Sequence, residues 1–284
     1  MTNIDAYKTK YSSTWCPGCG NFGIWLSLKN ALAHLGIPPW GVLVVYGVGC
    51  HGNMYDWMNA YGFVGLHGRT LPVAQGVKAA NHKLPVIVIT GDGDCLGEGG
   101  NHFIHAAKRN PDITVFIHDN QLYSLTTGQA SPTAKAGFAT KSTPQGVIDA
   151  PVNPLTLSLV AGATFVARGF SGDIPQLTKL MVEAIKHKGF SVLDILQPCV
   201  TFDKDHTYDW YRKRLYELSA SGFTTNDKNA AMLKATEWGD KIPFGIFYEE
   251  DKPTPEDHEK ALANMPLIDQ PLTVSIDNLI KEFI

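Results

Sequence analysis

The chain has 284 residues, of which 44% are hydrophobic and 18% charged, and this balance excludes an intrinsically disordered protein. Its net charge of −3 gives no electrostatic reason to expect a nucleic-acid partner. No apolar run is long enough to cross a bilayer, and the N-terminus lacks the pattern of a signal peptide, so we expect a cytoplasmic protein with no membrane partner.

A cysteine knuckle follows a loose lead-in over residues 1–14. It reads Trp15-Cys16-Pro17-Gly18-Cys19-Gly20 and precedes a predicted helix over residues 22–35. Two thiolates separated by two residues can hold one metal ion or one cluster. A zinc knuckle, a redox-active pair and two buried thiols are the alternatives. A redox pair usually opens a helix in a thioredoxin-like unit, which the surrounding residues do not form.

The next predicted strand covers residues 42–46 and ends in a glycine-rich turn over residues 47–52. Residues 54–67 are aromatic and glycine-rich, and we expect them to form a loop near the site. Small residues within 69–81 predict a helix packed tightly on the sheet.

A predicted βαβ unit follows, with a strand over residues 85–90, a helix over 97–110 and a strand over 114–117. Parallel strands joined by a helix place their ends at the same edge of the sheet, where open α/β folds bind ligands. The first strand runs into a Gly-Asp-Gly-Asp turn and the second runs into Asn120.

The turn Gly91-Asp92-Gly93-Asp94 combines glycines, which permit a tight turn, with carboxylates at the start of a helix. A helix N-terminus attracts phosphate, but these carboxylates would repel it unless a divalent cation lay between them. Mg²⁺ takes oxygen ligands from one or two carboxylates and from substrate phosphates. Asn120 could supply a further oxygen, so the residues alone predict a magnesium-diphosphate site.

The remaining chain continues the α/β pattern. An ordered loop over residues 122–154 is expected to line the site. Helices over 155–161 and 175–187 then alternate with strands over 164–167 and 191–196. Residues 200–284 contain a predicted helix over 228–238 and are expected to form an arm or small cap.

Four residues suited to holding metals lie just beyond four separate predicted strands: Cys50, Asp92, Asn120 and Cys199. If these strands are parallel neighbours, the residues converge on one edge of the sheet. This convergence is the strongest functional inference that the residues allow without any family knowledge.

The Gly91-Asp92-Gly93 motif followed by Asn120 resembles the thiamine diphosphate motif. In that family the Asp, the Asn and a main-chain carbonyl two residues further on hold Mg²⁺, which corresponds here to Asp92, Asn120 and Leu122. The chain has no Walker lysine motif, which disfavours a nucleotide site of that kind.

Cys16, Cys19, Cys50 and Cys199 could together bind either a zinc ion or a cubane iron–sulfur cluster. Their spacing, one close pair and two distant single cysteines, does not distinguish these alternatives. Zinc is redox-inert and would have little to do beside a thiamine carbanion, whereas a cluster can remove electrons from it.

The whole pattern resembles the β subunit of the 2-oxoacid:ferredoxin oxidoreductases. The matching segments are residues 15–20, 47–50, 66–69, 91–94, 119–120, 127–133, 197–199 and 238–248. The resemblance implies a 4Fe-4S cluster on Cys16, Cys19, Cys50 and Cys199, close to thiamine diphosphate and Mg²⁺. It also implies oxidative decarboxylation of a 2-oxoacid to acyl-CoA and CO₂, with electrons passed through the cluster to ferredoxin, and a partner α subunit, or a fused γ-α subunit, that completes the site.

Two sets of site residues follow from these motifs. The expected catalytic residues are His67, Arg69, Leu125 and Thr126, although hydrogen bonding at the surface is an alternative role for the first two. The expected cofactor-binding residues are Gly49, Cys50, Gly91, Asp92, Gly93, Asp94, Asn120, Leu122 and Tyr123. Thiamine enzymes also use a Glu to activate the aminopyrimidine, and the resemblance implies that the partner subunit supplies it.

We therefore expect an α/β fold: a parallel-sheet thiamine diphosphate-binding domain over residues 1–200 with helices on both faces, and a C-terminal arm over 201–284. Some relatives that accept 2-oxoglutarate carry basic residues where this chain has Asn53 and Thr127, which favours pyruvate or another monocarboxylic 2-oxoacid. Two other classes stay open. One is a non-oxidative thiamine decarboxylase with a structural zinc, and the other is a non-catalytic subunit that holds a metal for a partner.

Overall fold

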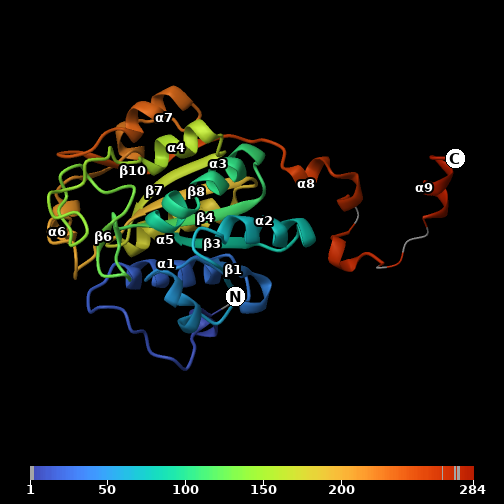
Figure 1. Cartoon of the computed structure of the whole chain (residues 1–284), viewed down its shortest axis with the longest axis horizontal. Coiled ribbons are helices and arrows are strands. Elements are labelled where there is room, and N and C mark those ends of the chain that lie inside the picture. Colours follow the sequence, from blue (N-terminus) through green and yellow to red (C-terminus); the bar gives the residue numbers. More distant parts are fainter. Residues whose placement is uncertain (1–2, 264, 272, 274–275) are drawn as a thin grey trace.

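One mostly parallel sheet organises the protein. The computed structural model describes residues 3–263, 265–271, 273 and 276–284, so residues 1–2 of the expected lead-in lie outside it. Its strand order within the described residues is β2-β1-β3-β4-β8-β7-β10-β9 (Figure 1). The strands are β1 (Leu43–Tyr46), β2 (Tyr61–Val64), β3 (Val86–Gly91), β4 (Ile113–Asp119), β7 (Phe165–Phe170), β8 (Phe190–Leu196), β9 (Leu215–Glu217) and β10 (Ile242–Glu249).

The strands that carry the expected site residues are parallel neighbours. β1 pairs with β3, β3 with β4, and β4 with β8, each in parallel. Their carboxyl ends therefore meet at one edge of the sheet, as the sequence predicts. Only β10, among the strands that the structure describes in this sheet, runs antiparallel to its neighbour β7.

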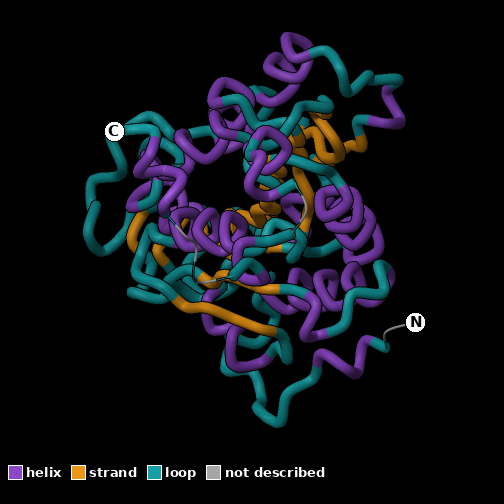
Figure 2. The backbone as a smooth tube through the Cα atoms, turned by 90° about the vertical axis from the view of Figure 1, so that its right-hand side faces the viewer, coloured by secondary structure: helices purple, strands orange, loops and turns teal. Residues whose placement is uncertain are grey.

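Helices cover both faces of the sheet (Figures 1 and 2). Both faces are apolar and need to be covered. In strand β3, for example, Val86 and Val88 face one apolar cluster and Ile87 and Ile89 face the other. The helices α1 (Asn21–His34) and α5 (Ile174–Lys186) pack on the Ile87 side. The opposite face carries α2 (Thr70–Ala80), α3 (Gly100–Arg109), α4 (Pro154–Ala161) and α7 (Lys228–Ala235). The expected α/β fold class is confirmed.

Two parts of the sheet differ from the sequence-based expectation. Strand β2 lies where a loop was expected, and its mostly exposed residues show no buried face that a sequence pattern could reveal. Strands β9 and β10 lie within the expected arm, and β10 contains Pro243 and Gly245, which usually argue against a strand. The sheet thus continues beyond residue 200.

Among the described residues that follow β10, the only helices are short ones, including α8 (Pro255–His258) and α9 (Asp277–Lys281), and Figure 1 shows them away from the sheet. A further short helix, α6 (Tyr208–Arg212), lies between β8 and β9, and β5 (Leu122–Tyr123) pairs with β6 (Gln129–Ala130) in a separate hairpin. No described helix combines the length and apolar character that a membrane span needs.

A buried ion pair joins two central strands. Arg168 on β7 lies opposite Asp194 on β8, and its Nε donates to Asp194 Oδ2 at 3.0 Å. The two residues are 1% and 0% exposed. Burial raises the pKa of Asp194, and the Arg168 guanidinium opposes that rise.

Replacing Arg168 by leucine should lower the free energy of unfolding by about 3–5 kcal/mol, because Asp194 would stay buried without a cation. The double variant Arg168→Leu/Asp194→Leu should recover much of that loss, since neither charge then remains. Urea denaturation followed by circular dichroism measures both. Equal losses in the single and double variants would show that the pair contributes through packing alone.

Candidate active site

A small cavity lies at the carboxyl edge of β1, β3 and β4. Its volume is about 60 Å³. Its lining residues are Val48, Gly49, Cys50, His51, His67, Gly91, Asp92, Gly93, Asp94, Asn120, Leu122, Tyr123, Ser124, Leu125 and Thr126. The structure thus brings together all the expected catalytic and cofactor-binding residues except Arg69, which instead contacts His102 on α3.

Close packing around the turn after β3 explains its glycines. A Cβ on Gly93 would lie 2.3 Å from the Tyr123 ring, and one on Gly91 would lie 2.7 Å from the His51 ring. The residues Gly93–Glu98 form a π-helical turn before α3 begins, a feature that often marks functional sites. Larger residues at either glycine would close the cavity.

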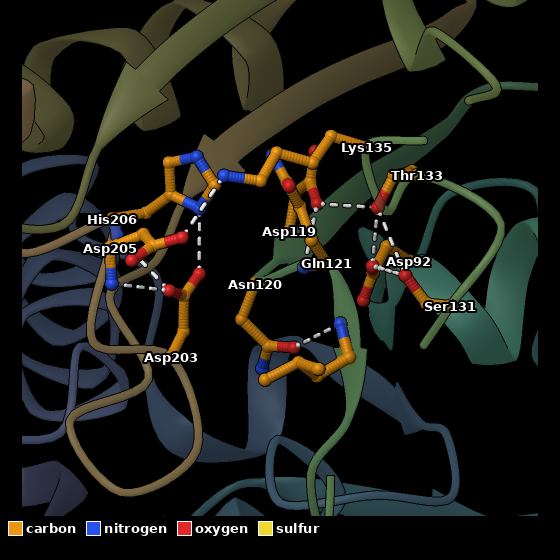
Figure 3. Close-up of polar contacts among 11 residues, drawn as sticks. Asp92, Asp119, Asn120, Gln121, Ser131, Thr133, Lys135, Asp203, Asp205 and His206 are labelled. Atoms are coloured by element: carbon orange, nitrogen blue, oxygen red, sulfur yellow. Dashed lines mark hydrogen bonds and ion pairs between the residues drawn. The ribbon is translucent and has the colours of Figure 1, made fainter. Parts of the chain in front are cut away.

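Asp92 is held from one side by two hydroxyl groups, as Figure 3 shows. Ser131 Oγ and Thr133 Oγ1 both donate to Asp92 Oδ2, the latter at 2.6 Å. The side chain is 1% exposed, and burial raises its pKa. A buried carboxylate held in this way is oriented to bind a cation or a proton.

Thr133 also links Asp92 to a second buried carboxyl group. Its Oγ1 lies 2.9 Å from Asp119 Oδ1 (Figure 3). One hydroxyl proton cannot be donated to both carboxylates, so one of them carries a proton when both contacts are hydrogen bonds. Burial, followed by the charges of Asp194 and Asp92, raises the pKa of Asp119 well above its usual value, which favours Asp119 as the protonated partner.

Asn120 connects the cavity to the cysteines. Its Oδ1 accepts from the Leu122 amide at 3.0 Å, which holds the chain in a tight turn. Its Nδ2 lies 3.2 Å from Gln197 Oε1, and Gln197 Nε2 in turn lies 3.5 Å from Cys19 Sγ. A continuous chain of polar contacts therefore runs from the expected magnesium ligand to an expected cluster ligand.

Asp94 accepts hydrogen bonds from several segments around the cavity. Its Oδ1 accepts from the Gly68 amide at 2.8 Å and lies 2.9 Å from His67 Nδ1, while Thr90 donates to its Oδ2 at 2.7 Å. Burial acts to raise the pKa of Asp94, but the contacts with His51, Gly68 and Thr90 lower it overall. Asp94 is thus an ionised group that accepts hydrogen bonds from Gly68 and Thr90 and lies in contact with His67.

Glu98 is a site residue that no sequence motif indicated. Its carboxylate lies 3.3 Å from His67 Nδ1 and accepts from the Tyr123 hydroxyl at 3.3 Å. Ser131, Thr133 and Gln197 were likewise not singled out as individual site residues, although the family motifs over residues 127–133 and 197–199 contain them. The position of Glu98 beside the cavity arises from tertiary packing and not from a sequence motif.

Replacing Glu98 by glutamine should lower kcat about tenfold, because His67 and Tyr123 lose the charge that orients them. KM and thermal stability should change little, since Glu98 is partly exposed. Steady-state kinetics of the assembled enzyme measure this, with the exposed Glu217→Gln as the matched control. A variant with unchanged kcat would exclude an orienting role.

The expected cluster ligands come from three segments that meet beside the cavity. The Gly20 amide donates to the Pro198 carbonyl at 3.2 Å, and Trp15 Nε1 donates to the Cys50 carbonyl at 2.6 Å. Burial, together with the nearby thiols of Cys199, Cys50 and Cys16, raises the pKa of Cys19 to about 12. Within the described ranges, no group of three or more His, Cys, Asp or Glu side chains is placed to hold a single metal ion.

A mostly parallel sheet with Asp92 and Asn120 lining one cavity fits the class of thiamine diphosphate-binding proteins. The family described as "Thiamine pyrophosphate enzyme, C-terminal TPP binding domain" matches residues 47–195. A second family, which describes the C-terminal part of the pyruvate ferredoxin oxidoreductase beta subunit, matches residues 199–264.

Individual relatives define the family more closely. A 2-oxoacid:ferredoxin oxidoreductase subunit beta from Saccharolobus solfataricus is 46% identical, covering 84% of this chain and 82% of the relative. One from Sulfolobus sp is 43% identical, covering 94% and 95%. A solved 2-oxoglutarate:ferredoxin oxidoreductase from Magnetococcus marinus, with 2-oxoglutarate, coenzyme A and succinyl-CoA bound, is 34% identical with a TM-score of 0.92, covering 99% of this chain and 96% of that one. The chain belongs to the β subunits of the thiamine diphosphate-dependent 2-oxoacid:ferredoxin oxidoreductases.

Proposed function

We propose that this subunit holds thiamine diphosphate through Mg²⁺ and carries a 4Fe-4S cluster beside it. Asp92, Asn120 and the Leu122 carbonyl would hold the Mg²⁺, and Cys16, Cys19, Cys50 and Cys199 would hold the cluster. With an α subunit it would convert a 2-oxoacid to acyl-CoA and CO₂ and pass the electrons to ferredoxin. One observation carries the proposal: Cys50 and Asp92 line the same cavity.

The residues at the cavity fit a magnesium ion. Asp92, Asn120 and Leu122 all line it, and they offer the oxygen ligands that Mg²⁺ prefers. Both hydroxyl contacts to Asp92 involve the same oxygen, Oδ2. Metal-binding carboxylates are usually oriented by such hydrogen bonds.

The cysteine positions favour a cluster over a single zinc ion. A zinc–thiolate bond is about 2.3 Å long, so sulfurs that share one zinc lie close together. Here three other thiols lie near enough to Cys19 to raise its pKa, yet no three ligand-type side chains among the described residues are placed for one ion. A cubane cluster holds its cysteines further apart because its several irons bind one thiolate each.

Thiamine diphosphate, held through Mg²⁺ by Asp92, Asn120 and Leu122, would supply a nucleophilic carbon and an electron sink for the decarboxylation of a 2-oxoacid. The residues of this chain have supporting roles. Glycines at positions 91 and 93 allow close backbone approach, Asp94 contacts His67 at the cavity wall, and Leu125 adds an apolar lining. Gln197 contacts both Asn120 and Cys19, which links the two proposed cofactor sites directly.

We propose that an α partner completes the cofactor site. A cavity of about 60 Å³ is far smaller than the roughly 300–1,000 Å³ of typical ligand pockets. An exposed apolar rim adjoins it on and after the edge strand β2, formed by Tyr61, Phe63, Val64 and Leu66. Such a patch is typical of a protein interface. We further propose that the arm expected over residues 201–284 contacts the partner through the part beyond β10, where Leu267, Ile268, Leu279 and Phe283 are exposed.

The substrate we favour is pyruvate or another monocarboxylic 2-oxoacid. Among the described residues, no lysine or arginine lines the cavity, and a second buried carboxylate needs a cation. Comparing kcat/KM for pyruvate and 2-oxoglutarate tests this. A preference for 2-oxoglutarate would mean that the α subunit supplies the cation.

Anaerobic co-purification with the α subunit, followed by iron, sulfide, zinc and thiamine analysis, tests the proposed function. We expect iron, sulfide and thiamine diphosphate in the complex, and no 2-oxoacid oxidation by the β subunit alone. Zinc in place of iron would favour a non-oxidative decarboxylase. Full activity of the isolated subunit would contradict the role of the partner.

A further inference from the structure

A second cavity lies beyond the carboxyl ends of β4 and β7, next to the start of α4. Its volume is about 300 Å³, and it shares no lining residue with the thiamine cavity. Its lining residues are Asp119, Gln121, Thr133, Lys135, Pro151, Val152, Asn153, Pro154, Thr156, Arg168, Thr236 and Trp238. This volume falls within the range of small-molecule sites. The proposed thiamine diphosphate and cluster sites do not occupy this cavity.

Arg168 is the residue that makes this cavity a binding site. Its side chain is almost fully buried, and its Nε is paired with Asp194. Its Nη1 is also buried but has no hydrogen-bond partner among the described residues. A buried cationic donor without a partner is costly, so a ligand atom at this position would stabilise it. The guanidinium also stacks on Trp238, 5.4 Å from the ring centre.

Lys135 supplies a second cation at this cavity. It pairs with Asp205 at 3.0 Å, but both side chains are about half exposed, so the pair is weak and can exchange. Figure 3 shows Lys135 above Asp119 and Gln121. Oδ1 of Asp119 is already hydrogen-bonded to the Thr133 hydroxyl and the Gln121 amide, at 2.9 Å and 3.2 Å.

The other walls are apolar. Val152, Pro151 and Pro154 line the cavity together with the half-exposed ring of Trp238. A site with a planar guanidinium at one end and apolar walls suits a flat carboxylate with an apolar body better than a bare phosphate.

We propose that this cavity binds a small carboxylic acid, with its carboxylate on Arg168 and Lys135 and its apolar part against Trp238 and Val152. The inference does not depend on the thiamine or cluster sites. It does imply coupling to them, because Thr133 lines this cavity and donates to Asp92 in the other. Any such coupling is reciprocal, so a ligand here and Mg²⁺ at Asp92 would change each other's affinity equally.

Titration of the complex with 4-fluorobenzoate, followed by ¹⁹F NMR, tests the proposal. We expect saturable binding whose Kd rises about tenfold in Lys135→Ala and in Trp238→Ala, because each variant removes one recognition element. The matched controls are Lys141→Ala, an exposed lysine in the same loop, and Trp40→Ala, an exposed tryptophan elsewhere. Both should keep the Kd of the unchanged protein, and circular dichroism confirms folding of every variant.

The uncharged 4-fluorobenzamide and inorganic phosphate complete the experiment. The amide should bind about tenfold more weakly, and phosphate should not displace the benzoate. Equal binding of the amide, or equal Kd values in all the variants, would overturn the proposal, as would a lack of saturation. Efficient displacement by phosphate would replace it with a phosphate site.

Discussion

Asp92→Asn should abolish Mg²⁺-dependent binding of thiamine diphosphate and lower activity by at least about a hundredfold. Loss of residues that only support a metal ligand typically costs 10–100-fold, so loss of a direct ligand should cost more. The substitution keeps the size of the side chain and the contacts of Ser131 and Thr133, so the effect should come from the lost charge. Calorimetric titration with thiamine diphosphate, with and without Mg²⁺, measures it.

The matched control is the exposed Asp240→Asn, which should bind thiamine diphosphate normally. Thermal stability should not fall in Asp92→Asn, because burial raises the pKa of this carboxyl group and a neutral amide is less costly to bury. Normal cofactor affinity in Asp92→Asn would exclude it as a magnesium ligand.

Cys199→Ala should remove the iron–sulfur cluster and, with it, electron transfer to ferredoxin. A cubane cluster needs its thiolate ligands. Cys199 lies in the loop after β8, and its thiol is close enough to Cys19 to raise the pKa of Cys19. Iron and sulfide per subunit should fall close to zero, together with the broad visible absorbance. Thiamine diphosphate binding should persist, because Asp92 and Asn120 are unchanged.

Cys95 provides the control for this substitution. It is buried directly after Asp94 but belongs to none of the segments that carry the other cysteines. Cys95→Ala should therefore keep its full iron content. Equal iron loss in both alanine variants would indicate a general effect of cysteine removal on folding, and unchanged iron in Cys199→Ala would refute its assignment as a ligand.

The sequence was most informative where a buried strand ends in a polar residue, because the strand pattern then predicts where the potential metal ligand lies. The apolar runs that end at Asp92 and Asn120 are fully buried strands, so their parallel pairing and common edge could be predicted. The same reasoning failed for β2, because an exposed edge strand has no buried face to give an alternating pattern. It failed for β10 because Pro243 and Gly245 lie within the strand.

Side-chain contacts between distant segments were less predictable. Glu98 lies in a π-helical turn, where its direction depends on one extra residue per turn, and no motif shows that it meets His67 and Tyr123. The unpaired Nη1 of Arg168 and the cavity beside it also arise only from tertiary packing. The cysteine spacing could not separate zinc from a cluster, since that choice depends on distances in space.

The most direct test of the whole account is a spectrum of the anaerobic αβ complex before and after addition of a 2-oxoacid, with no ferredoxin present. If the cluster on Cys16, Cys19, Cys50 and Cys199 lies beside the thiamine cavity, its visible absorbance should bleach as the substrate is consumed. CO₂ release without any bleaching, or a complex that contains no iron, would contradict the account.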